Sequence, residues 1–174
     1  MAYLKNGAVN FLNIHYALHA LAMNGAGVFW AVYLLEAGVP VPSVFGSLAL
    51  LLAARFLFRP TVLLLAPRFG LRALVAFGTV FSALQYVLLA EVRGVDLMLL
   101  ALCIVAAIGE TFYWTCYHAY FAALGDSEHR GKQISAREAI GSLSAIVGPL
   151  IGGWTLMTFG PRAAFGAAAA VQIL

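Results

Sequence analysis

The residues with the clearest chemical potential lie in an apolar stretch that runs from Leu97 to Leu124. Glu110 sits near the middle of this stretch, which is long enough to cross a bilayer as a single helix. An ionised carboxylate at that depth costs on the order of 3 kcal/mol unless it has a partner or water, and such groups usually have a function. Glu110 is therefore the first candidate for a functional, titratable residue.

Aromatic and protonatable side chains follow Glu110 at spacings of three and four residues. These spacings place them on the helical face that carries the carboxylate. Aromatic rings there could stack on an apolar or cationic substrate, and a histidine could titrate near neutrality. Packing inside the protein is the alternative for each of them. The residues on that face are Trp114, Tyr117, His118 and Phe121, and Tyr113 is a further candidate for stacking on a substrate.

Two earlier apolar segments also carry polar residues spaced four apart. The first contains His15 and His19, a spacing that indicates a helix face turned toward a wet interior. The second contains Arg55 and Arg59. Arginine stays charged, so Arg55, near mid-membrane by count, needs a carboxylate, carbonyl groups or water. We predict that Glu110 is its partner, as part of a transport pathway or as a structural ion pair, whereas Arg59 could extend to the headgroups.

Composition indicates an integral, multi-pass membrane protein. The 174 residues are 63% hydrophobic and only 10% charged, and the mean hydropathy is +0.94. A net charge of +3 is too small to indicate nucleic acid as a partner. Cys103 and Cys116 lie in one apolar segment at a spacing that fits neither zinc nor a disulfide, so we interpret them as packing residues. We expect no metal and no cofactor.

The pattern predicts an all-α bundle, and the loop charges predict its orientation. Basic residues are more frequent in the loops on one side of the predicted spans, which by the positive-inside rule places the amino terminus in the cytoplasm, at the cell (inner) membrane. That side carries Lys5, Arg68, Arg72, Arg130, Lys132 and Arg137, and the other Arg93 and Arg162. The expected helices cover residues 9–35, 43–65, 71–90, 97–124, 138–159 and 161–174, the last incomplete.

A short internal repeat suggests how the helices are related. Phe69-Gly-Leu-Arg-Ala73 opens the third predicted helix, and Phe159-Gly-Pro-Arg-Ala163 opens the sixth. With three helices per unit, the second copy enters the membrane from the opposite face. This arrangement is typical of an inverted three-helix repeat.

Three motifs give the chain a resemblance to a known family. Ala66-Pro-Arg-Phe-Gly-Leu-Arg72 is similar to the signature between helices 2 and 3 of the major facilitator superfamily, although Pro67 stands where that family has an aspartate. Arg130-Gly-Lys132 resembles the basic approach to helix 5. Gly148-Pro149-Leu-Ile-Gly152-Gly153 resembles the helix-5 motif of drug–proton antiporters, with Ser135 and Ser144 in place of upstream glycines. The resemblance covers essentially all 174 residues.

The resemblance implies a fold, an activity and a set of working residues. It implies an amino-terminal half bundle of two inverted three-helix repeats, with the carboxy-terminal half absent, that transports a small molecule across the lipid bilayer by alternating access. Export is the favoured direction, and protons are one candidate for the coupling ion. If protons drive transport, Glu110 is the first choice as the titrating group and the histidines are the second. The helix-4 arginine of many proton antiporters is absent, because no basic residue lies between Arg93 and His118.

The resemblance also assigns positions outside the transport pathway and leaves alternatives open. It assigns gating and helix packing to Gly148, Pro149, Gly152 and Gly153, and the cytoplasmic loop motif to Arg68, Gly70 and Arg72. No enzymatic activity is expected. The alternatives are a membrane partner or receptor that does not transport, a truncated relic on the same fold, and a redox protein that uses membrane histidines to hold haem or a metal.

Overall fold

The computed structural model describes residues 6–125 and 128–174, and all regular elements within them are helical. This confirms the all-α class. Five elements are long and apolar enough to cross a membrane, counting α1 to α2 as one. In chain order the elements are α1 (Gly7–Gly25), the short 3₁₀ turn η2 (Gly27–Phe29), α2 (Trp30–Glu36), α3 (Val41–Phe69), α4 (Leu71–Glu91), α5 (Leu97–Leu124) and α6 (Arg130–Ile173).

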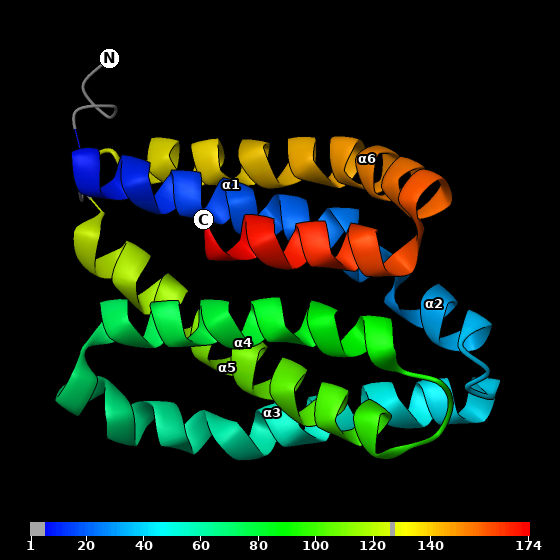
Figure 1. Cartoon of the computed structure of the whole chain (residues 1–174). Coiled ribbons are helices and arrows are strands. Elements are labelled where there is room, and N and C mark those ends of the chain that lie inside the picture. The colour runs from blue at the N-terminus through cyan, green and yellow to red at the C-terminus, as the bar shows by residue number, and fades with distance from the viewer. Residues whose placement is uncertain (1–5, 126–127) are drawn as a thin grey trace.

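The long helices lie side by side along a common direction (Figure 1). Within this bundle α5 packs against both α3 and α4, and α1 packs against α6. Contacts between α4 and α6 join these two groups. Helix α5 contributes buried side chains to both hydrophobic clusters of the protein. Side chains from the other helices therefore pack against α5.

Two glycines give the internal repeat a structural counterpart. Gly70 precedes α4 with φ 79° and ψ 156°, and Gly160 interrupts α6 with φ 80° and ψ 171°. This region of backbone conformation is essentially restricted to glycine. The two copies of the Phe-Gly-x-Arg-Ala sequence therefore share one turn geometry, at opposite ends of the bundle (Figure 1). Such a relationship fits the half bundle of inverted three-helix repeats expected from the sequence.

The helix boundaries differ in places from those expected. Helix α3 continues through Pro60 and Pro67 as far as Phe69, so the turn before α4 is reduced to Gly70. A membrane helix can absorb a proline because neighbouring groups satisfy the freed carbonyl. Helix α6 begins at Arg130, eight residues before the expected 138, which shortens the polar loop. The fifth and sixth expected helices are the two segments of α6 on either side of Gly160.

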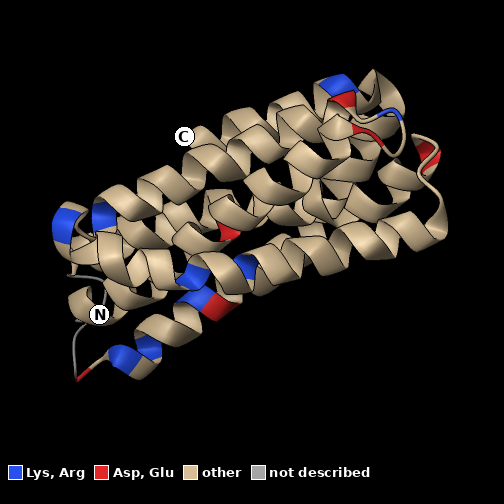
Figure 2. Cartoon of the chain, turned by 90° about the horizontal axis from the view of Figure 1, so that it is seen from below, with Lys and Arg blue, Asp and Glu red and all other residues tan. Residues whose placement is uncertain are grey.

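Many of the charged residues lie toward the two ends of the bundle (Figure 2). The end that contains the turn from α3 to α4 and the beginning of α6 carries Arg68, Arg72, Arg130, Lys132 and Arg137, and we call it the basic end. The opposite end carries Arg93 and Arg162. Lys5, which also entered the charge count, lies outside the described residues.

Candidate functional site

Arg55 and Glu110 form an ion pair between α3 and α5. Arg55 Nη1 lies 2.5 Å from Glu110 Oε2, with 28% and 19% of the two side chains exposed. Next to it, the hydroxyl of Thr111 donates to the backbone carbonyl of Arg55 at 3.4 Å. Two adjacent residues of α5 are thus bound to one residue of α3. The structure brings together the two charged groups that the sequence placed at mid-membrane depth.

A cavity of about 340 Å³ lies beside this ion pair. Its polar lining comes from Arg55, Glu110 and Gln85, and its aromatic lining from Trp30 and Tyr86. Leucines and a methionine complete the wall. Small-molecule sites commonly combine a mostly apolar wall with a few convergent polar groups. The cavity offers both signs of charge, an amide and two aromatic rings within one space.

His15 is held by a hydroxyl group of α4. Its Nε2 lies 3.2 Å from Thr79 Oγ1, which donates its own proton to the carbonyl of Val75 at 2.9 Å. A hydroxyl has one proton, so Thr79 accepts from His15. This network assigns the ring proton of neutral His15 to Nε2.

His19 is buried, with 2% of its surface exposed. Its Nδ1 accepts from Gln172 Nε2 at 2.6 Å, and its ring stacks on Tyr113 with the centroids 3.6 Å apart. The rings of Tyr113 and Tyr117 also stack, and both are fully buried. These three side chains are packed in the core in this conformation.

The remaining candidates of α5 lie nearer the basic end. Trp114 stacks on His118 with the ring centroids 5.5 Å apart, and Arg137 Nη1 of α6 lies 3.2 Å from His118 Nδ1. Because arginine only donates, His118 Nδ1 accepts, and the ring is neutral in this arrangement. Arg137 is also paired with Glu138. Its guanidinium lies over the ring of Tyr16, with Cζ 5.9 Å from the ring centroid.

The expected pathway residues therefore form two groups along α5. Glu110 belongs to the cavity shared with α3, whereas the histidines and aromatic rings form a cluster with α1 and α6. In the described part of the chain, no hydrogen bond or ion pair joins Glu110 to a histidine. The sequence did not identify several residues that contact the candidate residues or line the cavity. Two of them are glutamines, which could have been noticed as polar residues inside apolar segments. The missed residues are Trp30, Thr79, Gln85, Tyr86, Arg137 and Gln172.

The Gly148-Pro149 motif lies where α6 crosses α1. A Cβ atom on Gly152 would lie 1.6 Å from the carbonyl oxygen of Gly25, and one on Gly148 would lie 2.8 Å from Asn24 Cβ. A Cβ on Gly153 would meet only the Phe29 ring edge, at 3.5 Å. Gly148 and Gly152 thus permit a backbone-to-backbone approach, in the manner of small residues in membrane helix packing.

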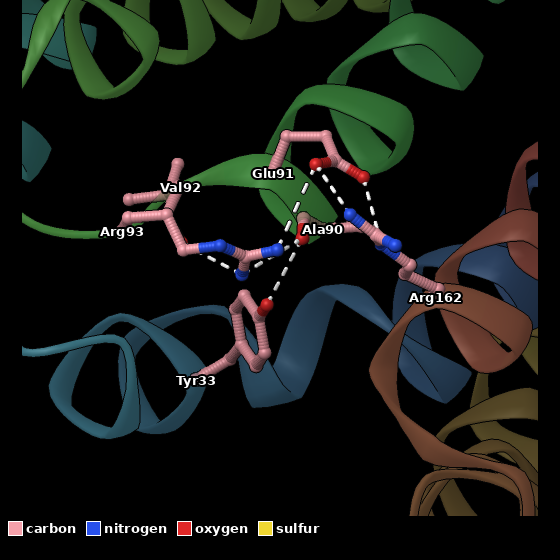
Figure 3. A network of polar contacts seen from close by, with 6 residues as sticks. All are labelled: Tyr33, Ala90, Glu91, Val92, Arg93 and Arg162. Carbon is pink, nitrogen blue, oxygen red and sulfur yellow. Dashed lines mark hydrogen bonds and ion pairs between the residues drawn. The ribbon is translucent and has the colours of Figure 1, made fainter.

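A network at the end opposite the basic end joins α2, α4 and the second segment of α6 (Figure 3). Arg162 contacts both carboxylate oxygens of Glu91, each at 3.0 Å, and Arg93 Nη2 lies 3.7 Å from the same carboxylate. The Tyr33 hydroxyl donates to the carbonyl of Ala90 at 3.1 Å. The pair of Arg162 with Glu91 connects the second segment of α6 to α4, whereas the buried tyrosine bond joins α2 to α4.

Removing this exposed ion pair is expected to change stability little. Glu91 and Arg162 are 43% and 71% exposed, and exposed pairs contribute little because water screens them. We expect Glu91→Gln to shift the melting temperature in detergent by no more than about 2 °C. Tyr33→Phe, which removes a buried hydrogen bond at the same end, should lower it more. A larger decrease in melting temperature for Glu91→Gln than for Tyr33→Phe would contradict this ranking.

The part of the chain that the structure describes has five helices long and apolar enough to cross a membrane, with an ion pair between two of them, and these are the features of an integral membrane protein. A family model described as Major Facilitator Superfamily matches residues 12–174. The chain belongs to the major facilitator superfamily and is a membrane transporter of that class. The comparisons with curated proteins and with solved structures gave no match.

Proposed function

We propose that this chain exports a small molecule by secondary active transport coupled to protons, with Arg55 and Glu110 as the coupling pair. The observation that carries the proposal is their ion pair beside a cavity of about 340 Å³ inside the bundle. An ionisable pair within membrane-spanning helices is by default a functional group, because its burial is costly. The family supports transport, and the pair supplies the means of coupling.

The chemistry of the pair would allow the exchange of a proton for a cationic substrate. While Glu110 is ionised, it is neutralised by Arg55. A proton on the carboxylate removes that charge, and a cationic substrate in the cavity would compete for the same oxygens. Trp30 and Tyr86 line the same cavity, and aromatic rings attract cations. Proton and substrate would then occupy Glu110 in turn, which is the requirement for antiport.

Alternating access assigns roles to the other residues. The close crossing of Gly25 with Gly148 and Gly152 provides a contact about which α1 and α6 could reorient, and Pro149 and Gly153 lie beside it. The carboxy-terminal half implied by the resemblance would form the opposing bundle. Arg68 and Arg72 at the basic end would face the cytoplasm, together with the amino terminus. The cluster of His15, His19 and His118 is the second candidate for proton movement.

The proposal is tested with the native protein, purified together with the opposing bundle, in liposomes that contain the pH dye pyranine. Ethidium serves as the cationic aromatic probe, and an imposed pH gradient drives its movement. We expect Glu110→Gln to abolish ethidium-dependent proton movement, because glutamine keeps the shape of the side chain but does not titrate. Glu36→Gln, an exposed carboxylate at the end of α2, is the matched control and should transport normally.

Two outcomes would contradict the proposal. Unchanged proton movement in folded Glu110→Gln would remove this residue from coupling while leaving transport intact. Absence of both ethidium and proton movement in the folded wild-type protein would favour the alternative, a membrane partner or receptor that does not transport.

A further inference from the structure

A second cavity, of about 450 Å³, opens at the basic end of the bundle. It lies where α1 and α4 begin and α5 ends. Its polar lining consists of Arg72, His15 and Tyr120, and its apolar lining includes Phe11, Leu12 and Val75. Neither Arg55 nor Glu110 lines it, so it is distinct from the cavity assigned to transport.

The polar side of this second cavity carries positive charge. Arg72 is exposed and permanently charged, and the structure shows no ion pair for it within the described residues. None of the lining residues is acidic. Tyr120 adds a hydroxyl, which can donate a hydrogen bond to an oxyanion, whereas the ring proton of His15 is already used in the bond to Thr79. Guanidinium and hydroxyl donors around one space suit a phosphate group.

The apolar side of the cavity lies on a segment that is long and apolar enough to cross a membrane. Phe11 is 76% exposed on the outer surface of α1, which belongs to a membrane-spanning segment, and Leu12 and Val75 are buried behind it. A ligand that occupies the whole space must therefore be charged at one end and apolar at the other. Free phosphate would leave the apolar wall without contacts, whereas a lipid would cover it.

We propose that this second cavity binds the headgroup and adjoining acyl segment of an anionic phospholipid from the leaflet at the basic end. Arg72 and Tyr120 bind the phosphate, His15 lies deeper against Thr79, and the acyl chain follows Phe11 along α1. The site is a fixed position for one lipid, and it does not depend on the transport activity proposed above. Attraction of lipid anions to basic residues at this depth is about 1 kcal/mol per residue.

The test counts lipids bound to the protein. Native mass spectrometry of the purified protein is carried out with phosphatidylglycerol and with phosphatidylcholine of the same acyl chains. We expect phosphatidylglycerol to bind at one saturable site with about fivefold higher affinity than phosphatidylcholine. Arg72→Gln should remove this preference. Arg68→Gln is the matched control, because Arg68 is an exposed arginine at the same end that does not line the cavity.

A second variant separates a defined site from general attraction to the basic end. Ala76→Phe places a ring into the lining of the cavity, where Ala76 is exposed, and should block the saturable site for both lipids without removing a charge. Equal affinity of the wild-type protein for the two lipids would overturn the proposal. So would an equal loss in Arg68→Gln and Arg72→Gln, or binding of glycerol phosphate as strong as that of the lipid.

Discussion

Replacing Arg55 by glutamine is expected to lower the free energy of unfolding by about 2–3 kcal/mol, whereas the same change at Arg59 should have little effect. Removing one partner of a fully buried ion pair costs about 3–5 kcal/mol, since the other charge is left unpaired. The pair with Glu110 is partly exposed, at 28% and 19%, so the loss should be smaller. Arg59 is one helical turn further along α3, is exposed, and has no ion pair within the described residues.

The buried cysteines of α5 provide a direct readout for this comparison. Cys103 and Cys116 are free and buried, so a thiol-reactive fluorescent dye labels them only when the helix bundle opens on heating. For Arg55→Gln we expect labelling to begin roughly 5–10 °C lower than in the wild-type protein. Equal melting temperatures for Arg55→Gln and Arg59→Gln would show that the ion pair contributes nothing to folding.

The charge-reversed double variant separates stability from coupling. Arg55→Glu with Glu110→Arg restores an ion pair, so stability should recover in part relative to either single reversal. The carboxylate would then lie on α3 and no longer on α5. Transport should stay lost if the position of Glu110 matters for exchange, and it should return if the pair serves only to join the helices. This result decides between the two roles that the sequence left open for Glu110.

The pairing of Arg55 with Glu110 could be predicted because charged groups in the hydrocarbon core have few other polar partners. A permanent cation and a carboxylate, both near mid-membrane by count, each avoid the cost of an unpaired charge when they form an ion pair. Spacing along one helix was less informative for the aromatic residues. It placed Tyr117 on the face of Glu110 but did not show that α1 and α6 cover that face. Periodicity predicts which residues share a side, whereas the neighbouring helix decides whether that side is open.

Hydrogen bonds between residues that are far apart in the chain could not be predicted from the sequence. His19 accepts from Gln172, 153 residues away, and His15 donates to Thr79, 64 residues away. Apolar helices of similar composition do not specify their neighbours by pattern alone. The repeat around Gly70 and Gly160 was visible because its turn geometry requires glycine. The start of α6 at Arg130 was not, because a polar first turn of a helix resembles a loop in composition.

The other large effect concerns two adjacent glycines of α6, for which we expect opposite results. Gly152→Ala should destabilise the protein by about 1–3 kcal/mol, the usual range for overpacking, since the new Cβ would lie 1.6 Å from the backbone oxygen of Gly25. Gly153→Ala meets only the ring edge of Phe29 at 3.5 Å, an ordinary contact. Alanine is favoured over glycine within a helix by up to about 1 kcal/mol, so this second variant should be neutral or stabilising.

The same pair of variants tests whether the close crossing of α1 and α6 is the populated state. Thiol labelling of the heated protein in detergent gives the two melting temperatures, and their order is the result that matters. If Gly152→Ala is as stable as Gly153→Ala, the two backbones are not in contact in most molecules, and a more open arrangement prevails. If it is less stable as expected, the variant penalises only the closed crossing. Gly152→Ala should then increase the fraction of molecules in which α1 has moved away from α6. Faster thiol labelling of a single cysteine introduced at Asn24 would detect this shift.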